Sequence, residues 1–422
     1  MIKKINLKSD FLKHIAVLMS GTMIAQLINL GISIIIYQNF YNPEEAAELG
    51  LFARISGVGA AIATARYEFA MPIAKTDVHS FRLYRLALRL ALISSGVSAL
   101  VFLIPMFLAG NVSDGLFYGL IPLGMFLTAY YSIGTNWAIR TREFRSISFS
   151  KVANVGFGGG LKVLFGWLGT GYIGLIIGTI GGLFVSNVWF AKTFQRANLK
   201  FGVKAKSPRT KFLARTYDDF PKVNLPHTMM DLGRELLVAI LILQLFTKAD
   251  FGLYDHSYRM LRMPLMLAGL AISQVFFQRC AEKFNKGEDI LPLVLKAVKV
   301  LVLASIVPFG LIFLFGDELF AWVFSEKWRG AGEYSQIMAP WFMLNFIASP
   351  ISFLPLILGK QKQFFAMAAV GAISMILGFW IPDTFFQASI ETTLWIVSLS
   401  QVAYFLFVIF KTFQYLKEAK PS

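Results

Sequence analysis

A succession of long apolar segments constrains this chain more than any other feature of its sequence. Segments of roughly 20 mostly apolar residues follow one another from His14 almost to Lys411, and a helix of that length crosses the hydrocarbon layer of a bilayer. Only 15% of the residues are charged, against about a quarter in soluble domains. We therefore expect an all-α polytopic membrane protein.

Hydropathy places about 12 transmembrane helices along the chain. Their approximate bounds are 14–40, 49–74, 88–108, 116–139, 152–168, 172–191, 225–247, 251–278, 293–315, 334–359, 364–382 and 392–410. An even number of spans puts both ends of the chain on the same side of the membrane.

The distribution of basic residues predicts which side that is. Of the 40 Lys and Arg residues, 31 fall in the tails and in the loops on one side, whereas the opposite loops hold only Lys248, Lys327 and Arg329. Because cytoplasmic loops carry an excess of Lys and Arg, we expect both termini in the cytoplasm. The net charge of +16 then reflects topology and not nucleic-acid binding, since the basic residues lie in short separated loops.

Motifs for metal, nucleotide or disulfide chemistry are missing from the sequence. A single cysteine, Cys280, excludes an intrachain disulfide and a multi-cysteine metal site. Neither a P-loop nor a HExxH zinc signature occurs, so we expect no metal and no cofactor. The apolar segment after the basic N-terminus is too long for a signal peptide and should stay as the first span.

Unusual residues recur at similar spacing in the two halves of the chain. The matched features are "DFLK" at 10–13 and "DFPK" at 219–222, "LGLF" at 49–52 and "FGLY" at 251–254, Pro105 and Pro308, and Pro122 and Pro340. Such spacing predicts a parallel repeat. We expect an N-terminal lobe at 1–191, a basic cytoplasmic linker at 192–222 and a C-terminal lobe at 223–422, each lobe with six spans.

Ten charged residues lie inside the predicted spans. The basic ones are Arg54, Arg66, Lys162, Arg234, Arg259 and Arg262, and the acidic ones are Glu68, Asp231, Glu235 and Asp255. A charge at mid-bilayer costs roughly 2.5 to 3.5 kcal/mol on insertion scales, so these side chains should face an aqueous cavity or a partner. Basic groups outnumber acidic ones by six to four, and we expect buried guanidinium groups to outnumber their counter-ions.

Helical spacing sorts these charges further. Asp255, Arg259 and Arg262 share one face of their span, with Asp255 and Arg259 placed to pair. Asp231 lies three and four residues before Arg234 and Glu235, so that cluster can either satisfy itself or serve a ligand.

Arg66 and Glu68 stand two residues apart in "ATARYEFAMPIAK", residues 63–75. On a continuous helix they would point about 200° apart and could not pair. Arg66 then either reaches toward cytoplasmic water with its long side chain or lines a cavity, while Glu68 locks the span to a neighbouring helix. Pro72 should loosen the helix just beyond.

The N-terminal part of the chain resembles a known family. "FLKHIAVLMSGTMIAQLINLGISIIIYQNFYNPEE", "LGLF" and "ATARYEFAMPIAK" are similar to bacterial polysaccharide-unit flippases, the O-antigen translocase group of the multidrug/oligosaccharidyl-lipid/polysaccharide exporter superfamily. The likeness is strongest over residues 9–75. Further along, it is carried by the span number, the two-lobe repeat and the basic "RTREFR" turn at 140–145.

The resemblance implies two six-helix lobes around a central cavity in the bacterial inner membrane. It implies a polyprenyl-diphosphate-linked oligosaccharide as substrate, for O-antigen, capsule or exopolysaccharide assembly, and polysaccharide polymerase and chain-length proteins as candidate partners. The six basic residues would bind the substrate, and the four acidic residues are candidates for proton or sodium coupling.

Three other functions remain as alternatives to the flippase. A multidrug exporter of the same superfamily normally handles organic cations, which a cavity with surplus arginine should repel. A polysaccharide polymerase should show a sizeable outer loop with clustered catalytic side chains, and the longest outer loop, about 316–333, is short. A passive channel would need a symmetric pore-lining ring, which two unequal halves do not supply.

Overall fold

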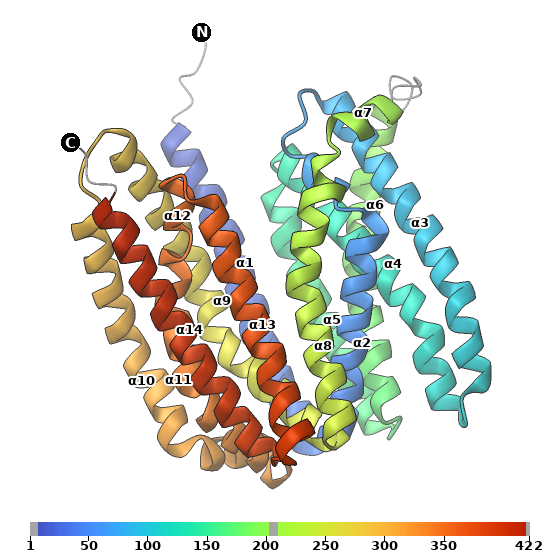
Figure 1. The fold of residues 1–422 in the computed structure, drawn as a ribbon. Helices are drawn as coiled ribbons and strands as arrows, with labels where there is room; N and C mark the ends of the chain where they lie inside the picture. Colours follow the sequence, from blue (N-terminus) through green and yellow to red (C-terminus); the bar gives the residue numbers. More distant parts are fainter. Residues whose placement is uncertain (1–6, 202–209, 419–422) are drawn as a thin grey trace. The chain divides into compact units, whose positions relative to one another are not determined.

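A computed structural model describes residues 7–201 and 210–418, and nearly all of these residues are helical. They form two compact units (Figure 1). Unit 1 comprises Met1–Tyr41 and Glu48–Leu236, and unit 2 comprises Asn42–Ala47 and Leu237–Ser422. The predicted all-α class is confirmed.

Each predicted span overlaps with a long helix of the described chain. In unit 1, or mostly within it, these are α1 (Leu7–Asn39), α2 (Pro43–Thr64), α3 (Asp77–Leu108), α4 (Val112–Thr141), α5 (Phe144–Trp167), α6 (Tyr172–Phe201) and α8 (Leu225–Leu245). In unit 2 they are α9 (Lys248–Asn285), α10 (Leu291–Phe324), α11 (Arg329–Ile351), α13 (Gln361–Phe386) and α14 (Ile390–Glu418). Short helical elements join them: η1 (Tyr67–Ala70), α7 (Thr210–Thr216), η3 (Phe220–Asn224), η4 (Glu326–Trp328) and α12 (Leu354–Ile357).

Nine helical segments of the described residues are long and apolar enough to cross a membrane. The protein is therefore a multi-pass membrane protein, whereas the count of twelve crossings stays a prediction. The three helices outside the nine are α5, α8 and α9. All three carry charged residues of the predicted site, including Lys162, Arg234 and Arg259, so the features that suggested a site also make these helices more polar.

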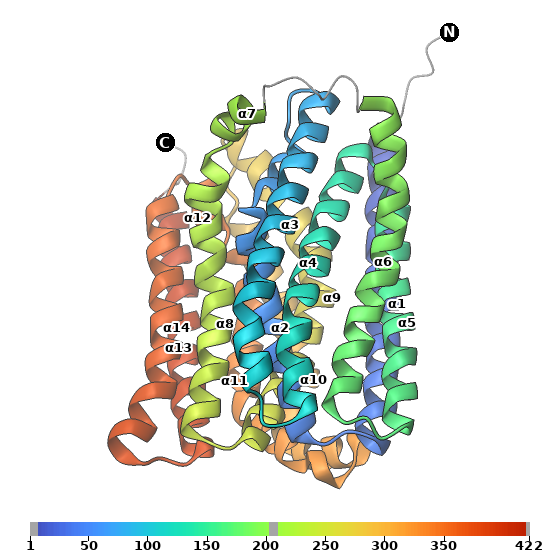
Figure 2. The same ribbon diagram turned by 90° about the vertical axis from the view of Figure 1, so that its right-hand side faces the viewer.

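Unit 1 is built from two tightly packed helix pairs. Helix α6 packs on α5 and α4, α4 also packs on α3, and α5 packs on α1 (Figure 2). Glycines bring α5 and α6 together, because a Cβ at Gly158 would lie 2.8 Å from the carbonyl oxygen of Gly178. Helix α2 reaches α4 through Phe52, whose ring centroid is 6.1 Å from that of Phe117.

Unit 2 repeats these pairings around α11. Helices α9, α10 and α14 pack on α11, and α13 packs on α14. Ser257 of α9 donates a hydrogen bond to the carbonyl oxygen of Ala331, and Ser398 of α14 donates one to that of Ile337. These bonds fix the neighbours of α11 in a membrane setting, where hydrophobic burial between helices contributes little.

The helix–helix contacts that recur in the two units agree with the residue matches between the two halves of the sequence. Pro105 lies in α3 and Pro308 in α10, while Pro122 lies in α4 and Pro340 in α11. The pair α3 and α4 in unit 1 thus corresponds to α10 and α11 in unit 2.

The predicted lobes at 1–191 and 223–422 and the linker at 192–222 stay predictions. The compact units divide at Leu236 and Leu237, inside α8. Residues 202–209 of the predicted linker lie outside the described residues, while 192–201 continue α6.

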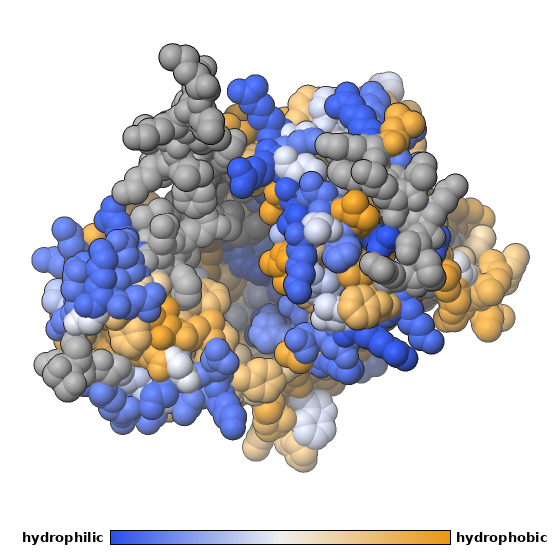
Figure 3. All heavy atoms as spheres, turned by 90° about the horizontal axis from the view of Figure 1, so that it is seen from above, coloured by the Kyte–Doolittle hydropathy of each residue, from blue (hydrophilic) through white to orange (hydrophobic). Residues whose placement is uncertain are grey.

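Hydrophilic residues gather on one end of the helices. Figure 3 looks onto the end that lies uppermost in Figure 1, and much of this face is hydrophilic. In unit 1 this end holds the start of α3 and the C-terminal ends of α4 and α6, with Arg140, Arg142 and Arg196 among their residues.

Candidate functional site

Helix α2 ends ten residues earlier than the sequence predicts. The expected span ran to residue 74, but α2 stops at Thr64. Ala65 and Arg66 then have φ values of 48° and 61°, in the left-handed region, and the short helix η1 follows. Pro72 is therefore not where the helix breaks. The sequence gives no warning, because left-handed residues are usually glycine or asparagine.

Local hydrogen bonds stabilise the break. The hydroxyl of Thr64 donates to the carbonyl oxygen of Ala60, 3.4 Å away, and accepts from the amide of Arg66 at 3.3 Å. The amide of Ala65 donates to the carbonyl oxygen of Ile62. Each left-handed residue costs roughly 1 to 2 kcal/mol, so the surrounding contacts must hold it.

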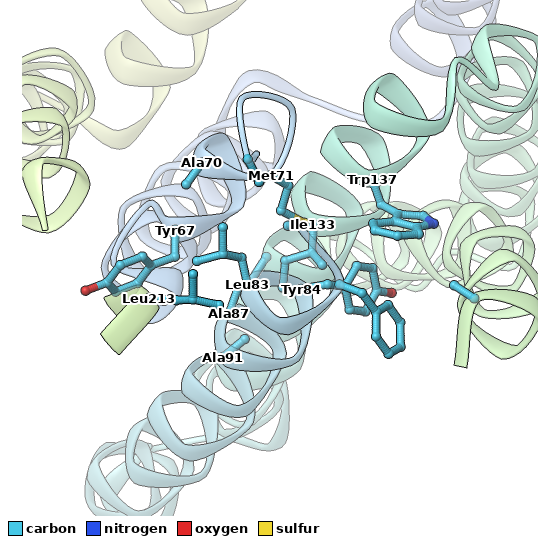
Figure 4. Close-up of a cluster of buried hydrophobic side chains, with 14 of the residues drawn as sticks. Tyr67, Ala70, Met71, Leu83, Tyr84, Ala87, Ala91, Ile133, Trp137 and Leu213 are labelled. Atoms are coloured by element: carbon cyan, nitrogen blue, oxygen red, sulfur yellow. The ribbon is translucent and has the colours of Figure 1, made fainter. Parts of the chain in front are cut away.

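Those contacts come from a buried apolar cluster at the ends of several helices (Figure 4). Tyr67, Ala70 and Met71 pack there against Tyr84 of α3 and Trp137 of α4, among other residues. The hydroxyl of Tyr67 donates a hydrogen bond to the carbonyl oxygen of Ala214 in α7. One side of the η1 segment is thus fixed by packing, which leaves Arg66 and Glu68 to meet on the other.

Arg66 and Glu68 form an ion pair, so the prediction that they could not pair is wrong. Arg66 Nη1 lies 3.5 Å from Glu68 Oε1. The prediction assumed a continuous helix, and the break at residues 65 and 66 removes the 200° separation. Glu68 is only 1% exposed, and its Oε1 also accepts a hydrogen bond from Ser132 Oγ of α4 at 3.3 Å. This bond agrees with the alternative in which Glu68 links its segment to a neighbouring helix.

Protein atoms surround the guanidinium of Arg66. Its Nε donates to Asn224 Oδ1 at 3.2 Å, and its Cζ lies 4.1 Å from the centroid of the Phe69 ring. The side chain is 18% exposed, so Arg66 does not extend freely into water. We name Arg66, Glu68, Ser132 and Asn224 the Arg66 cluster.

A polar stripe on α8 begins at the Arg66 cluster. Asn224, Thr228, Asp231 and Glu235 follow at intervals of four, three and four residues, which places them on one helical face. Thr228 donates to the carbonyl oxygen of Asn224. Beside the stripe, Arg234 Nη2 lies 4.0 Å from Asp231 Oδ1. The charges of Arg234 and Asp231 therefore partly neutralise each other, as one of the two alternatives predicted.

The other two basic candidates of unit 1 lie on separate helices. Arg54 is half-buried on α2, and its Nη1 donates to the carbonyl oxygen of Gly50. Lys162 is half-buried on α5, where its aliphatic stem lies against Gly178 of α6. Neither residue joins the contacts of the Arg66 cluster described above.

In unit 2 the charges follow the predicted helical face. Arg259 Nη2 lies 2.7 Å from Asp255 Oδ2, which confirms the predicted pair. Asp255 is buried, whereas the Arg259 side chain is 38% exposed. Arg262 is exposed, and its Cζ lies 5.3 Å from the centroid of the Tyr258 ring.

Three of the guanidinium groups have counter-ions: the pair of Arg259 was predicted, that of Arg234 was one of two alternatives, and that of Arg66 was not expected. Arg66, Arg234 and Arg259 each pair with a carboxylate, because each has an acid within four residues along the chain. The roles of all ten charged residues in binding or coupling stay predictions.

Sequence reasoning missed Asn224 and Ser132. Asn224 could have been found, because it lies seven residues before Asp231 and so on the same face. Ser132 gave no signal, since a serine inside an apolar span usually bonds to its own helix.

One family profile matches the chain. The family described as "Polysaccharide biosynthesis protein" matches residues 97–333, more than half of the 422 residues. No curated protein matches the chain by sequence.

Several solved membrane transporters share the fold. An inward-facing multidrug resistance MATE family transporter of the MOP superfamily aligns with a TM-score of 0.73 and 14% identity over 96% of this chain and 99% of its own. Lipid II flippase MurJ, in an inward closed conformation, aligns with a TM-score of 0.66 and 14% identity over 96% of this chain and 89% of its own.

A third structure belongs to a MOP superfamily transporter from Pyrococcus furiosus, for which a reversed polarity of the binding pocket is described as suggesting a different function. It aligns with a TM-score of 0.61 and 14% identity over 97% of both chains. Together these alignments establish the fold.

Proposed function

Because the chain belongs to the polysaccharide biosynthesis protein family and has the fold of the MATE and MurJ transporters, we propose that it is a flippase for lipid-linked oligosaccharides. Its cargo would be a polyprenyl diphosphate carrying an oligosaccharide repeat unit, moved across the bacterial inner membrane by alternating access. The observation that carries the proposal is the family match, which spans most of unit 1 and the first part of unit 2. The MurJ-like fold supports it, since MurJ is a flippase for Lipid II.

The chemistry of this cargo requires a sheltered cation. A diphosphate cannot enter hydrocarbon without a large desolvation cost, and guanidinium groups bind phosphate oxygens in a planar, two-pronged geometry. Arg66 suits this role, because its hydrogen bonds to the described residues use Nε and Nη1 and leave Nη2 for a phosphate oxygen. Arg259 and Arg262 are the corresponding candidates in unit 2, followed by Arg54, Lys162 and Arg234.

Glu68 offers a way to couple transport to protons. A phosphate bound to Arg66 would compete with Glu68 for the guanidinium. The distance of 3.5 Å between Arg66 Nη1 and Glu68 Oε1 is long for a charge-assisted bond. Glu68 would then be a buried carboxylate without its ion-pair partner, a state that binding of a proton or sodium ion would neutralise. Asp231, Glu235 and Asp255 are further candidates for proton or sodium binding.

The proposal is tested by deleting the gene in its host and locating the carrier-linked intermediates. A flippase defect should leave complete repeat units on the cytoplasmic face of the inner membrane. Accumulation of single units on the outer face would contradict the proposal and favour a polymerase.

The same strain separates the flippase from a multidrug exporter. We expect loss of surface polysaccharide, of O-antigen, capsule or exopolysaccharide type, with unchanged tolerance to organic cations. Lower drug tolerance with normal surface polysaccharide would overturn the proposed cargo.

A further inference from the structure

A pocket of about 410 Å³ opens at one end of unit 1. Its walls come from the start of α3, the C-terminal end of α4, the turn into α5 and the C-terminal part of α6, at the end of the helices that Figure 3 faces. Asp77, Trp137, Arg140, Arg142, Glu143 and Arg196 are among its lining residues. We call it the Arg142 pocket. It shares no lining residue with the Arg66 cluster.

The floor of the Arg142 pocket is rigid. Trp137 is buried, and its ring centroid lies 5.7 Å from that of Phe81 and 5.8 Å from that of Tyr84. The Tyr84 ring in turn stacks on Phe194 of α6 at 4.9 Å. This aromatic packing joins α3, α4 and α6 beneath the turn that carries Arg142 and Glu143.

Arg140 is fixed at the pocket wall. Its Nη2 lies 3.0 Å from Asp77 Oδ1, to which its Nε also donates. Its Nη1 donates to the carbonyl oxygen of Pro72 at 3.1 Å. The charge of Asp77 is thus balanced by Arg140, and neither group is left to neutralise the remaining arginines of the pocket.

Arg142 and Arg196 supply positive charge without internal pairing. Both side chains are exposed, and neither pairs with a carboxylate among the residues that the structure describes. Arg142 ends α4 in the left-handed conformation, with φ 60°, which aims the chain away from the helix axis. The remaining carboxylate, that of Glu143, accepts a hydrogen bond from Ser146. Two arginines therefore face one acid.

We propose that the Arg142 pocket binds a phosphate group at the cytoplasmic surface. Two guanidinium groups that approach one pocket from different helices match the several oxygens of a phosphate ester or diphosphate. The group could belong to an anionic phospholipid or to a soluble phosphate compound. This site lies within unit 1, is separate from the residues proposed for cargo binding, and does not depend on the proposed function.

The test compares two double variants with the same change in charge. R142Q with R196Q removes both arginines from the pocket. R145Q with K192Q removes two exposed cations that lie three and four residues away along the chain and do not line it. Both are made in the full chain, and their thermal midpoints without ligand should match that of the wild type.

One arm of the test uses inorganic pyrophosphate, titrated by calorimetry into protein in detergent. The second counts phosphatidylglycerol molecules retained from mixed micelles by native mass spectrometry. In at least one arm the pocket variant should bind about tenfold more weakly than the wild type, because it loses charge-assisted bonds, while the control variant binds as the wild type does.

The pattern across the two arms identifies the source of the phosphate. A difference with pyrophosphate indicates a soluble phosphate compound, a difference with phosphatidylglycerol indicates a lipid headgroup, and a difference in both supports the shared chemistry. Equal binding by the wild type and the pocket variant in both arms would overturn the proposal. An equal loss in the control variant, or no binding by the wild type in either arm, would overturn it as well.

Discussion

Helices α2 and α9 carry matched motifs in the two halves of the sequence, yet α2 ends soon after its motif and α9 continues. "LGLF" at 49–52 lies in α2 and "FGLY" at 251–254 in α9. Helix α2 ends at Thr64, whereas α9 runs through Pro264 to Asn285. The break lets Arg66 reach Glu68 of η1 and Asn224 of η3. The unbroken α9 instead pairs Asp255 with Arg259 along a single helix.

The difference shows how one topology can hold charge in two ways. In the Arg66 cluster the charges depend on tertiary contacts among several elements of unit 1, so their geometry responds to movement of those elements. In unit 2 the pair depends on local helix geometry. On the proposed function, we propose that the Arg66 cluster holds the charge that responds to substrate, and four experiments test the comparison of the two units.

The largest expected effect is on export. Arg66→Gln should lower surface polysaccharide by at least about tenfold, and Arg262→Gln by a smaller factor, since each loses a charge-assisted bond to phosphate. The measurement is surface polysaccharide in a complemented deletion strain at matched protein levels, with Arg145→Gln as the control. Unchanged export in both variants would exclude Arg66 and Arg262 from the proposed binding site.

The next effect is on stability. Arg66→Gln should lower the free energy of unfolding by about 2 kcal/mol, because Glu68 is 1% exposed and loses a charge-assisted partner. Arg259→Gln should cost only about 0.5 kcal/mol, since that guanidinium is 38% exposed and the pair is an i, i+4 helix pair. Denaturant titration of the purified variants measures both, and a larger loss for Arg259→Gln would reverse the comparison.

Replacing alanine with glycine should have opposite effects at the break after α2 and inside α9. Ala65→Gly removes the steric cost of an alanine in the left-handed conformation, but glycine also raises the conformational entropy of the unfolded chain. The net effect should be a stabilisation of roughly 0.5 kcal/mol. Ala281→Gly places glycine inside the continuous α9 and should destabilise it by about 1 kcal/mol. Thermal midpoints that shift in the same direction would contradict the difference between the two helices.

The smallest effect concerns a solvent-facing pair in unit 2. Arg329 donates hydrogen bonds to Glu326 and holds the pKa of that carboxyl below its ordinary value. A lowered pKa stabilises the folded state above the unfolded pKa, and this contribution is lost as the pH falls through the folded pKa. The thermal midpoint of Arg329→Gln should lie slightly below the wild type at neutral pH and approach it in acid. A difference in thermal midpoint between the wild type and the variant that stays the same at every pH would show that the substitution acts through packing and not through the charge of Glu326.

Sequence patterns predict the helices well because apolar spans of this length have few other structures available in a bilayer. The pairing of Asp255 with Arg259 was also predictable, since helical spacing alone determines it. The break after Thr64 was not, because alanine and arginine give no local signal for a left-handed turn. Every error at the Arg66 cluster followed from that one backbone change.

Contacts between segments that are distant along the chain are the second feature that the sequence did not predict. The bond from Arg66 to Asn224 joins residues 158 positions apart, and the bond from Ser132 to Glu68 joins α4 to η1. The spacing of residues in one sequence shows which of them share a face of a helix, but not which other segments pack against that face. The Arg142 pocket was missed for the same reason, since its arginines come from different helices.

The most direct measurement of the central claim is flipping by purified protein. Proteoliposomes would carry a labelled polyprenyl-diphosphate oligosaccharide, and an impermeant reagent or lectin would report its arrival in the opposite leaflet. We predict arrival with the wild type and at least about tenfold slower arrival with Arg66→Gln. Equal rates for the wild type, Arg66→Gln and empty liposomes would contradict the account.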